Sequence, residues 1–148
     1  MFWAAAFERV ALQDLVLTES SMAAAAGPRE AIVEFLRTYT SADKDWPFQV
    51  WLDAWAEAAR RPALQATSRR LNLAWQGLPE RTILAGVASG VFRCSDPGGV
   101  AWRILSLLDG LALQVVAHGT TVSRDDVTRW TKAAAEGELG LAPEALAG

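Results

Sequence analysis

The segment Val100–His118, which reads VAWRILSLLDGLALQVVAH, constrains the fold most. Drawn as a helix, its apolar side chains cover roughly twice the arc of about 100° that an amphipathic surface helix needs. The central stripe consists of Ala101, Ile104, Leu105, Leu108, Ala112 and Val115, and its flanks add Leu107, Leu111, Trp102, Leu113 and Val116. We therefore expect a central helix that is surrounded on most sides.

The remaining stripe of this helix is made of small or polar residues. It holds Gly99, Arg103, Ser106, Gly110, Gln114 and Ala117. A glycine inside a helix costs about 1 kcal/mol relative to alanine, so Gly110 indicates the close approach of another backbone. The stripe predicts a helix–helix seam between two copies of the chain, and a crossing within one copy is the alternative.

Helical periodicity extends over most of the other residues. We expect helices at residues 3–23, 28–40, 46–60, 63–76, 79–89, 97–118 and 124–136, with Gly77-Leu78-Pro79 breaking or kinking one of them. Asp96-Pro97 and Ser123 with Asp126 are typical helix starts. No segment alternates with period two, so we predict an all-α fold. It is a single bundle of about seven helices over residues 1–148, with a frayed tail at 137–148.

Composition excludes several classes of function. A net charge of −3 argues against a nucleic-acid surface. One cysteine and one histidine exclude an internal disulfide and the usual zinc spacings, and they leave few options for a catalytic dyad. Arg103, Asp109 and Gln114 interrupt the longest apolar run, so we expect no membrane span. We expect a protein that is not an enzyme, with no catalytic residue, metal or cofactor.

Seven tryptophans in 148 residues must either fill the core or line a ligand site. Trp51 and Trp55 stand one helical turn apart and can form one aromatic wall. Apolar side chains of this kind are the usual lining of a small-molecule pocket. The predicted ligand-binding residues are Phe35, Tyr39, Trp51, Trp55, Leu71, Trp75, Trp102, Leu105 and Asp109.

Asp109 is the most informative single residue, because it falls inside the apolar arc of the central helix. A carboxylate there costs several kcal/mol unless it is paired or hydrogen-bonded. Two interpretations remain open at this point. Asp109 is either structural, as a satisfied buried carboxylate or as part of a partly wet helix edge, or it is the polar anchor of a ligand cavity.

Two stretches carry a resemblance to a known family: WLDAWAEAARRPALQ (51–65) and GVASGVFRCSDPGGVAWRILSLLDGLALQ (86–114). They resemble the C-terminal half of TetR-family transcriptional regulators, closest to the BetI- and AcrR-like branch. The matching residues are Trp55, Arg60, Arg61, Gly90, Phe92, Asp96, Leu107, Leu108, Asp109, Gly110 and Leu111. The resemblance covers roughly residues 7–135, and LLDGLALQ is its most specific part.

The resemblance implies a ligand-binding and dimerisation domain. Residues 96–118 and 123–136 would pair with their copies as a four-helix bundle, the earlier helices would enclose a small apolar or aromatic ligand, and residues 5–23 would transmit its binding. The implied homodimer interface contains Arg103, Ser106, Gly110, Gln114, Val127, Trp130 and Ala134. We expect a cytoplasmic repressor.

The sequence departs from the family in two respects. No helix-turn-helix precedes the first helix, so we expect no direct nucleic-acid binding by this chain alone. Gly77-Leu78-Pro79 also falls within what is usually one continuous helix. The alternative function is a headless interaction module that heterodimerises with a full-length regulator. A tightly filled aromatic core favours that module, whereas a void of several hundred Å³ favours a ligand sensor.

Overall fold

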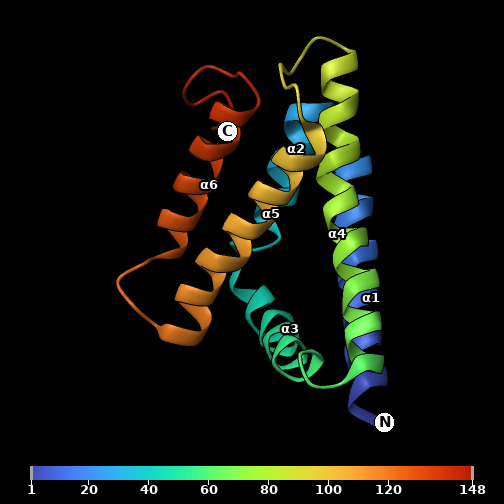
Figure 1. Ribbon diagram of the computed structural model, residues 1–148. Helices are drawn as coiled ribbons and strands as arrows, with labels where there is room; N and C mark the ends of the chain where they lie inside the picture. The colour runs from blue at the N-terminus through green and yellow to red at the C-terminus, as the bar shows by residue number, and fades with distance from the viewer. Residues whose placement is uncertain (1, 148) are drawn as a thin grey trace.

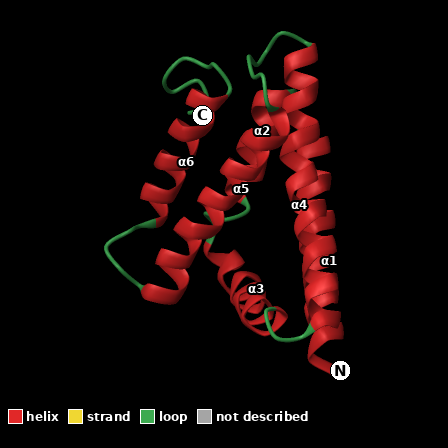
Figure 2. Ribbon diagram, in the orientation of Figure 1, coloured by secondary structure: helices red, strands yellow, loops and turns green. Residues whose placement is uncertain are grey.

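A computed structural model describes residues 2–147, and in that range helices joined by loops are present and no strand, as predicted (Figure 2). Six α-helices take the place of the seven expected. They are α1 (Phe2–Ala23), α2 (Pro28–Arg37), α3 (Asp45–Ala58), α4 (Pro62–Ala88), α5 (Pro97–Leu113) and α6 (Arg124–Glu138). A 3₁₀ turn, η1 (Ala42–Lys44), precedes α3, and a π-helical turn, η2 (Gln114–His118), follows α5.

The two longest helices, α1 and α4, lie side by side along one edge of the molecule (Figure 1). Helix α5 packs between α4 and α6, and α3 closes the end of the bundle where the chain begins. The core is formed by every helix from α1 to α6, with Phe7, Phe35, Trp75, Leu108 and Leu139 among its buried side chains. Helix α4 thus packs directly on α5, and α3 contacts the π-helical turn η2 that follows it.

Helix α4 is continuous through Gly77-Leu78-Pro79, so the predicted division into two helices is wrong. Proline removes one backbone N–H and clashes with the preceding turn, which costs about 3 kcal/mol in an isolated helix. Here Leu78, Pro79 and the neighbouring Gln76 are all buried. The Gln76 amide also donates to the Gly98 carbonyl (3.2 Å), which ties α4 to the start of α5. Tertiary packing therefore outweighs the local helix-breaking signal.

The predicted helix starts are confirmed. Asp96 precedes α5, and its side chain accepts a hydrogen bond from the Gly99 N–H, while Pro97 is the first helical residue. Ser123 and Asp126 form a reciprocal capping box at the start of α6, with both hydrogen bonds at 3.1 Å. Such caps satisfy N–H groups that have no partner inside the helix. Local sequence thus determines where both C-terminal helices begin.

The tail after residue 137 is anchored over the described residues, contrary to the expected fraying. Glu136 is buried, and its carboxylate accepts hydrogen bonds from the N–H groups of Glu144 and Leu146, both at 3.0 Å. Leu139 and Leu146 insert into the core, at 0% and 2% exposure. Gly140 and Pro143 therefore lie in turns that fold the tail back onto the bundle.

The segment Pro97–His118 is long and apolar enough to cross a membrane by length and composition, which corrects the expectation that its polar residues exclude this. A core helix of a globular protein meets the same criterion. Here the buried residues of α5 face α4 and α6: Val100, Ala101, Ile104, Leu105, Leu108 and Ala112. One side of the helix stays exposed, including Trp102, Arg103, Ser106 and Gly110. Within one subunit, α5 is therefore less fully surrounded than its sequence predicts.

Candidate functional site

An aromatic cluster occupies the space between α1, α2, α3 and α4. Trp51 of α3 contacts Phe7 of α1 edge-on, with ring centroids 5.2 Å apart, and Trp75 of α4 at 6.3 Å. Phe35 and Tyr39, at the end of α2, lie 6.4 and 6.3 Å from Trp75. Most of these pairs are edge-to-face or tilted, the arrangements that aromatic quadrupoles favour. Four elements therefore converge on one aromatic site.

The cluster reaches the surface through α3. Phe48 contacts Tyr39 at 6.0 Å and Trp55 at 5.9 Å, and Trp55 lies 5.8 Å from Trp51. Trp51 is buried, whereas Trp55 is only partly buried. The row of aromatic side chains on α3 thus leads from the core to an open groove beside Trp55.

Asp109 of α5 lies next to this cluster as a largely buried carboxylate. Its Oδ1 atom is buried without a hydrogen-bond partner in the described residues, and the same holds for the indole nitrogen of Trp75. Burial raises the pKa of Asp109 to about 7, and the Tyr39 hydroxyl, which donates toward the carboxylate, offsets part of that rise. Burial, together with the nearby Asp109 charge, raises the pKa of Tyr39 well above 10. Asp109 can therefore change its protonation state near neutral pH.

A groove with a volume of about 810 Å³ opens between α3, α4 and α5 on the outer side of Asp109. Trp55 and Asp109 line it together with polar residues of α4 and the short α3–α4 turn: the full lining is Trp55, Ala58, Ala59, Pro62, Gln65, Ala66, Ser68, Arg69, Asn72 and Asp109. The groove is open to solvent. It connects the carboxylate with the surface, so a small molecule can reach Asp109 from this side.

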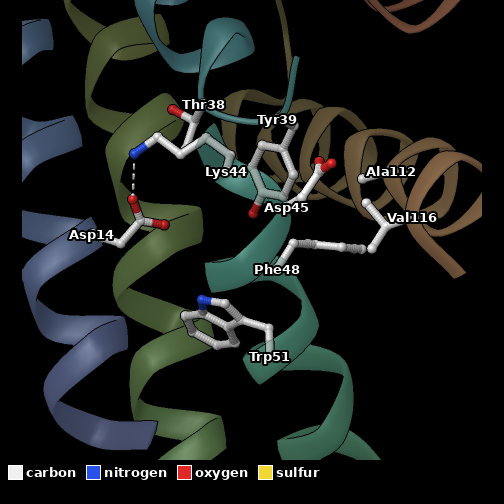
Figure 3. A pocket seen from close by; sticks show the side chains of 9 residues that line it. All are labelled: Asp14, Thr38, Tyr39, Lys44, Asp45, Phe48, Trp51, Ala112 and Val116. Carbon is white, nitrogen blue, oxygen red and sulfur yellow. Dashed lines mark hydrogen bonds and ion pairs between the residues drawn. The ribbon is translucent and has the colours of Figure 1, made fainter. Parts of the chain in front are cut away.

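On the inner side the cluster is tightly packed. The cavity drawn in Figure 3 has a volume of only about 20 Å³, close to one water-sized space. Lys44 and Asp14 form an ion pair (2.7 Å) at its edge and join η1 to α1. Asp45, also at this cavity, pairs with Arg124 at the start of α6. The space large enough for a ligand is therefore the groove.

The structure brings five of the predicted aromatic ligand-binding residues into one cluster: Phe35, Tyr39, Trp51, Trp55 and Trp75. Leu71 and Leu105 are buried in the core beside it. Trp102 does not join it, because its side chain is 38% exposed on α5. The sequence-based selection missed Phe7 and Phe48. Phe48 carried a usable signal, since it lies one turn before Trp51 on the same face of its helix.

The predicted dimer-interface residues lie on α5, η2 and α6. Four of them are exposed to solvent: Arg103, Ser106, Gly110 and Trp130. Gln114 and Ala134 are partly exposed. Arg103 donates two hydrogen bonds to Glu138 within the same chain, at 2.7 and 2.8 Å. Val127 is only 1% exposed and packs inside its own subunit, so its side chain offers almost no surface to a second copy. This placement corrects the assignment of Val127 and leaves the others as predictions.

Comparison with known proteins identifies the class of this fold. A crystal structure of a transcriptional regulator from Saccharomonospora viridis, determined in complex with choline, has the same fold with a TM-score of 0.79. The sequences are 24% identical, and the match covers 88% of this chain and 69% of the regulator's chain. No curated protein matches the sequence. This chain thus shares the fold of that regulator.

The family follows from the sequence itself. Residues 28–140 match the family described as the C-terminal domain of BetI-type transcriptional repressors. This range spans α2 to α6, so the chain belongs to the BetI-type branch of the TetR family. The family consists of non-enzymatic repressor domains. The resemblance found in the sequence is therefore confirmed.

Proposed function

We propose that this domain binds a compact organic cation and dimerises, as the sensing part of a TetR-type repressor that acts in the cytoplasm. Ligand binding would be relayed through α1 to a DNA-binding head. The sequence alone favoured an apolar or aromatic ligand. We keep the prediction that the ligand makes apolar contacts, and we propose in addition that it carries a positive charge, because the site contains a carboxylate.

The position of Asp109 carries this proposal. A buried carboxylate beside aromatic rings is costly without a partner, and its Oδ1 atom has none among the described residues. A quaternary ammonium group would pair with the carboxylate, and its methyl groups would contact the face of Trp55, which lines the same groove, through cation–π interactions. The choline complex of the Saccharomonospora viridis regulator supports this ligand class.

The test compares two molecules of equal shape by isothermal titration calorimetry. Choline and 3,3-dimethyl-1-butanol differ in one atom, a positive nitrogen replaced by carbon. We expect choline to bind and the neutral alcohol to bind much more weakly. Asp109→Asn should weaken choline binding by about 2 kcal/mol or more, which is about 30-fold in Kd.

Asp53→Asn is the matched control, because Asp53 is an exposed aspartate on α3 outside the groove lining. It should leave the affinity for choline unchanged. Equal binding of choline and the neutral alcohol, with no loss in Asp109→Asn, would show that the ligand is apolar and uncharged and would refute the cation proposal.

The dimer part of the proposal is supported by the exposed side of α5 and α6. Trp102 and Trp130 are 38% and 43% exposed there, and a Cβ atom added at Gly110 meets no heavy atom within 4 Å. Gly110→Leu should therefore leave the fold of one subunit intact and disturb only a partner packed on that stripe. We expect a shift from dimer to monomer in sedimentation velocity at micromolar concentration.

The control for the dimer test is Ala85→Leu, which adds the same side chain at an exposed position of α4. It should not change the association state. A wild-type protein that sediments as a monomer would remove the dimer proposal. A Gly110→Leu variant that remains dimeric would remove only the seam on this stripe.

The alternative function, a module that heterodimerises with a full-length regulator, is favoured by one observation. The aromatic cluster encloses a cavity of only about 20 Å³, so the core itself is filled. A pure interaction module would bind none of the organic cations tested and would form a mixed dimer with a full-length relative. The calorimetric experiment therefore also separates these two functions.

A further inference from the structure

The groove beside Asp109 holds two opposite charges at different depths. Asp109 lines it with a carboxylate whose Oδ1 atom is buried. Arg69 of α4 lines the same groove and is exposed to solvent. One site therefore contains a buried acidic group and an exposed basic group.

Neither charge is neutralised by the protein. Among residues 2–147, Arg69 and Asp109 form no ion pair within 4.0 Å, with each other or with a third residue. The next residue along α4 behaves differently, because Arg70 pairs with Glu8 of α1. Arg69 thus offers its charge to the groove, while the neighbouring arginine joins two helices.

We propose that the groove selects a zwitterion: a quaternary ammonium compound that also carries an anionic group, with the ammonium at Asp109 and the anion at Arg69. This inference rests on the proposed cation site and extends it to the other end of the ligand. A guanidinium binds a carboxylate or phosphate through two parallel hydrogen bonds.

The groove also contains neutral polar groups that suit an anionic ligand end. Gln65, Ser68 and Asn72 line it with Arg69, and all four residues come from α4 and can hydrogen-bond an anionic group. Trp55 and Asp109, which line the same groove, supply an aromatic face and a carboxylate. A ligand with charge at one end only would leave one of the two groove charges without a partner.

The test uses three soluble molecules that share a trimethylammonium group: choline, carnitine and carnitine amide. Carnitine has a carboxylate, and its amide is the neutral counterpart of that group. We expect carnitine to bind the wild-type protein about tenfold more tightly than the amide, because a hydrogen-bonded charge pair adds roughly that factor. Arg69→Gln should abolish this preference, so that carnitine and its amide bind the variant equally.

Arg9→Gln is the matched control, since it removes the same charge from an exposed position of α1 outside the groove. It should keep the preference for carnitine. Equal binding of all three molecules by wild type and Arg69→Gln would overturn the zwitterion inference and leave the cation site standing. A carnitine preference that survives in Arg69→Gln would also overturn it. Binding of none of them would overturn both the inference and the proposed cation site.

Discussion

Replacing Asp109 by asparagine should change how the stability of the protein depends on pH. Burial raises the pKa of this carboxyl from 3.8 to about 7 in the folded state. The folded protein therefore holds a proton on Asp109 over a pH range in which the unfolded chain has lost it. Because the folded state binds the extra proton, its stability decreases as pH rises from about 4 to about 7 and then levels off.

The size of the effect follows from the two pKa values. With 3.8 unfolded and about 7 folded, the linkage relation gives a loss of about 2 kcal/mol in the free energy of unfolding between pH 5.5 and 8. The Tyr39 hydroxyl faces the carboxyl, and Arg69 lines the same groove as Asp109 without pairing with it. An asparagine side chain cannot ionise, so the Asp109→Asn variant should lack this loss.

The assay is urea unfolding at pH 5.5 and at pH 8, without ligand, for wild type and Asp109→Asn. The difference between the two proteins removes the contribution of every other titrating group. We expect the variant to gain about 2 kcal/mol relative to wild type on going from pH 5.5 to pH 8. Parallel pH dependence of the two proteins would show that the carboxyl is hydrated or paired and would refute the account of its burial.

Two further predictions concern packing, and a third concerns the tail. Gly86→Ala should lower the free energy of unfolding by about 1–3 kcal/mol, because the added Cβ would lie 2.1 Å from a ring carbon of buried Phe92. Within one subunit, a Cβ atom at Gly110 meets nothing within 4 Å, so the same change there should instead stabilise helix α5 of the monomer by about 1 kcal/mol. Equal effects at the two sites, in urea unfolding at concentrations too low for dimers, would contradict both assignments. Glu136→Gln should speed amide hydrogen exchange at Leu146, because one of the two carboxylate oxygens that now accept tail N–H groups is replaced by a donor. Unchanged exchange there would mean that the tail is held by its buried leucines alone.

The sequence predicts local features of this fold, such as helix caps, well. It predicts poorly the contacts between distant residues that outweigh an unfavourable local signal. Caps such as Ser123 with Asp126 depend only on neighbouring residues, and both C-terminal helices begin where the pattern places them. The continuity of α4 depends on what packs around Pro79 and Gln76, which lie far along the chain from Gly98. The anchored tail similarly depends on a carboxylate, Glu136, that looks like an ordinary surface charge in the sequence.

In the candidate site, too, the residues selected from the sequence are those with a local signal, and the residues that were missed depend on the tertiary structure. Helical spacing was enough to group Trp51 with Trp55, and the mismatch of a carboxylate in an apolar arc was enough to select Asp109. The contribution of Phe7 could not be predicted, because it comes from another helix and no spacing rule links it to α3. Arg69 was missed for a different reason: an exposed arginine on a helix is common, and only the groove distinguishes it from Arg70.

The protonation of Asp109 links the stability of the domain to the binding of its ligand. This link gives a functional reason for a buried carboxylate that destabilises the unliganded domain. Above pH 7 the uncharged aromatic surroundings disfavour the carboxylate, so the unliganded domain is destabilised there. A bound cation would stabilise the ionised form of Asp109, so binding should release a proton near neutral pH. For the same reason, the increase in melting temperature caused by choline should be larger at pH 8 than at pH 5.5. A neutral ligand in the same groove would give equal shifts at the two pH values. The pH dependence of the shift therefore reports the charge of the ligand and the protonation of Asp109 in one measurement, without any substitution that could alter the fold.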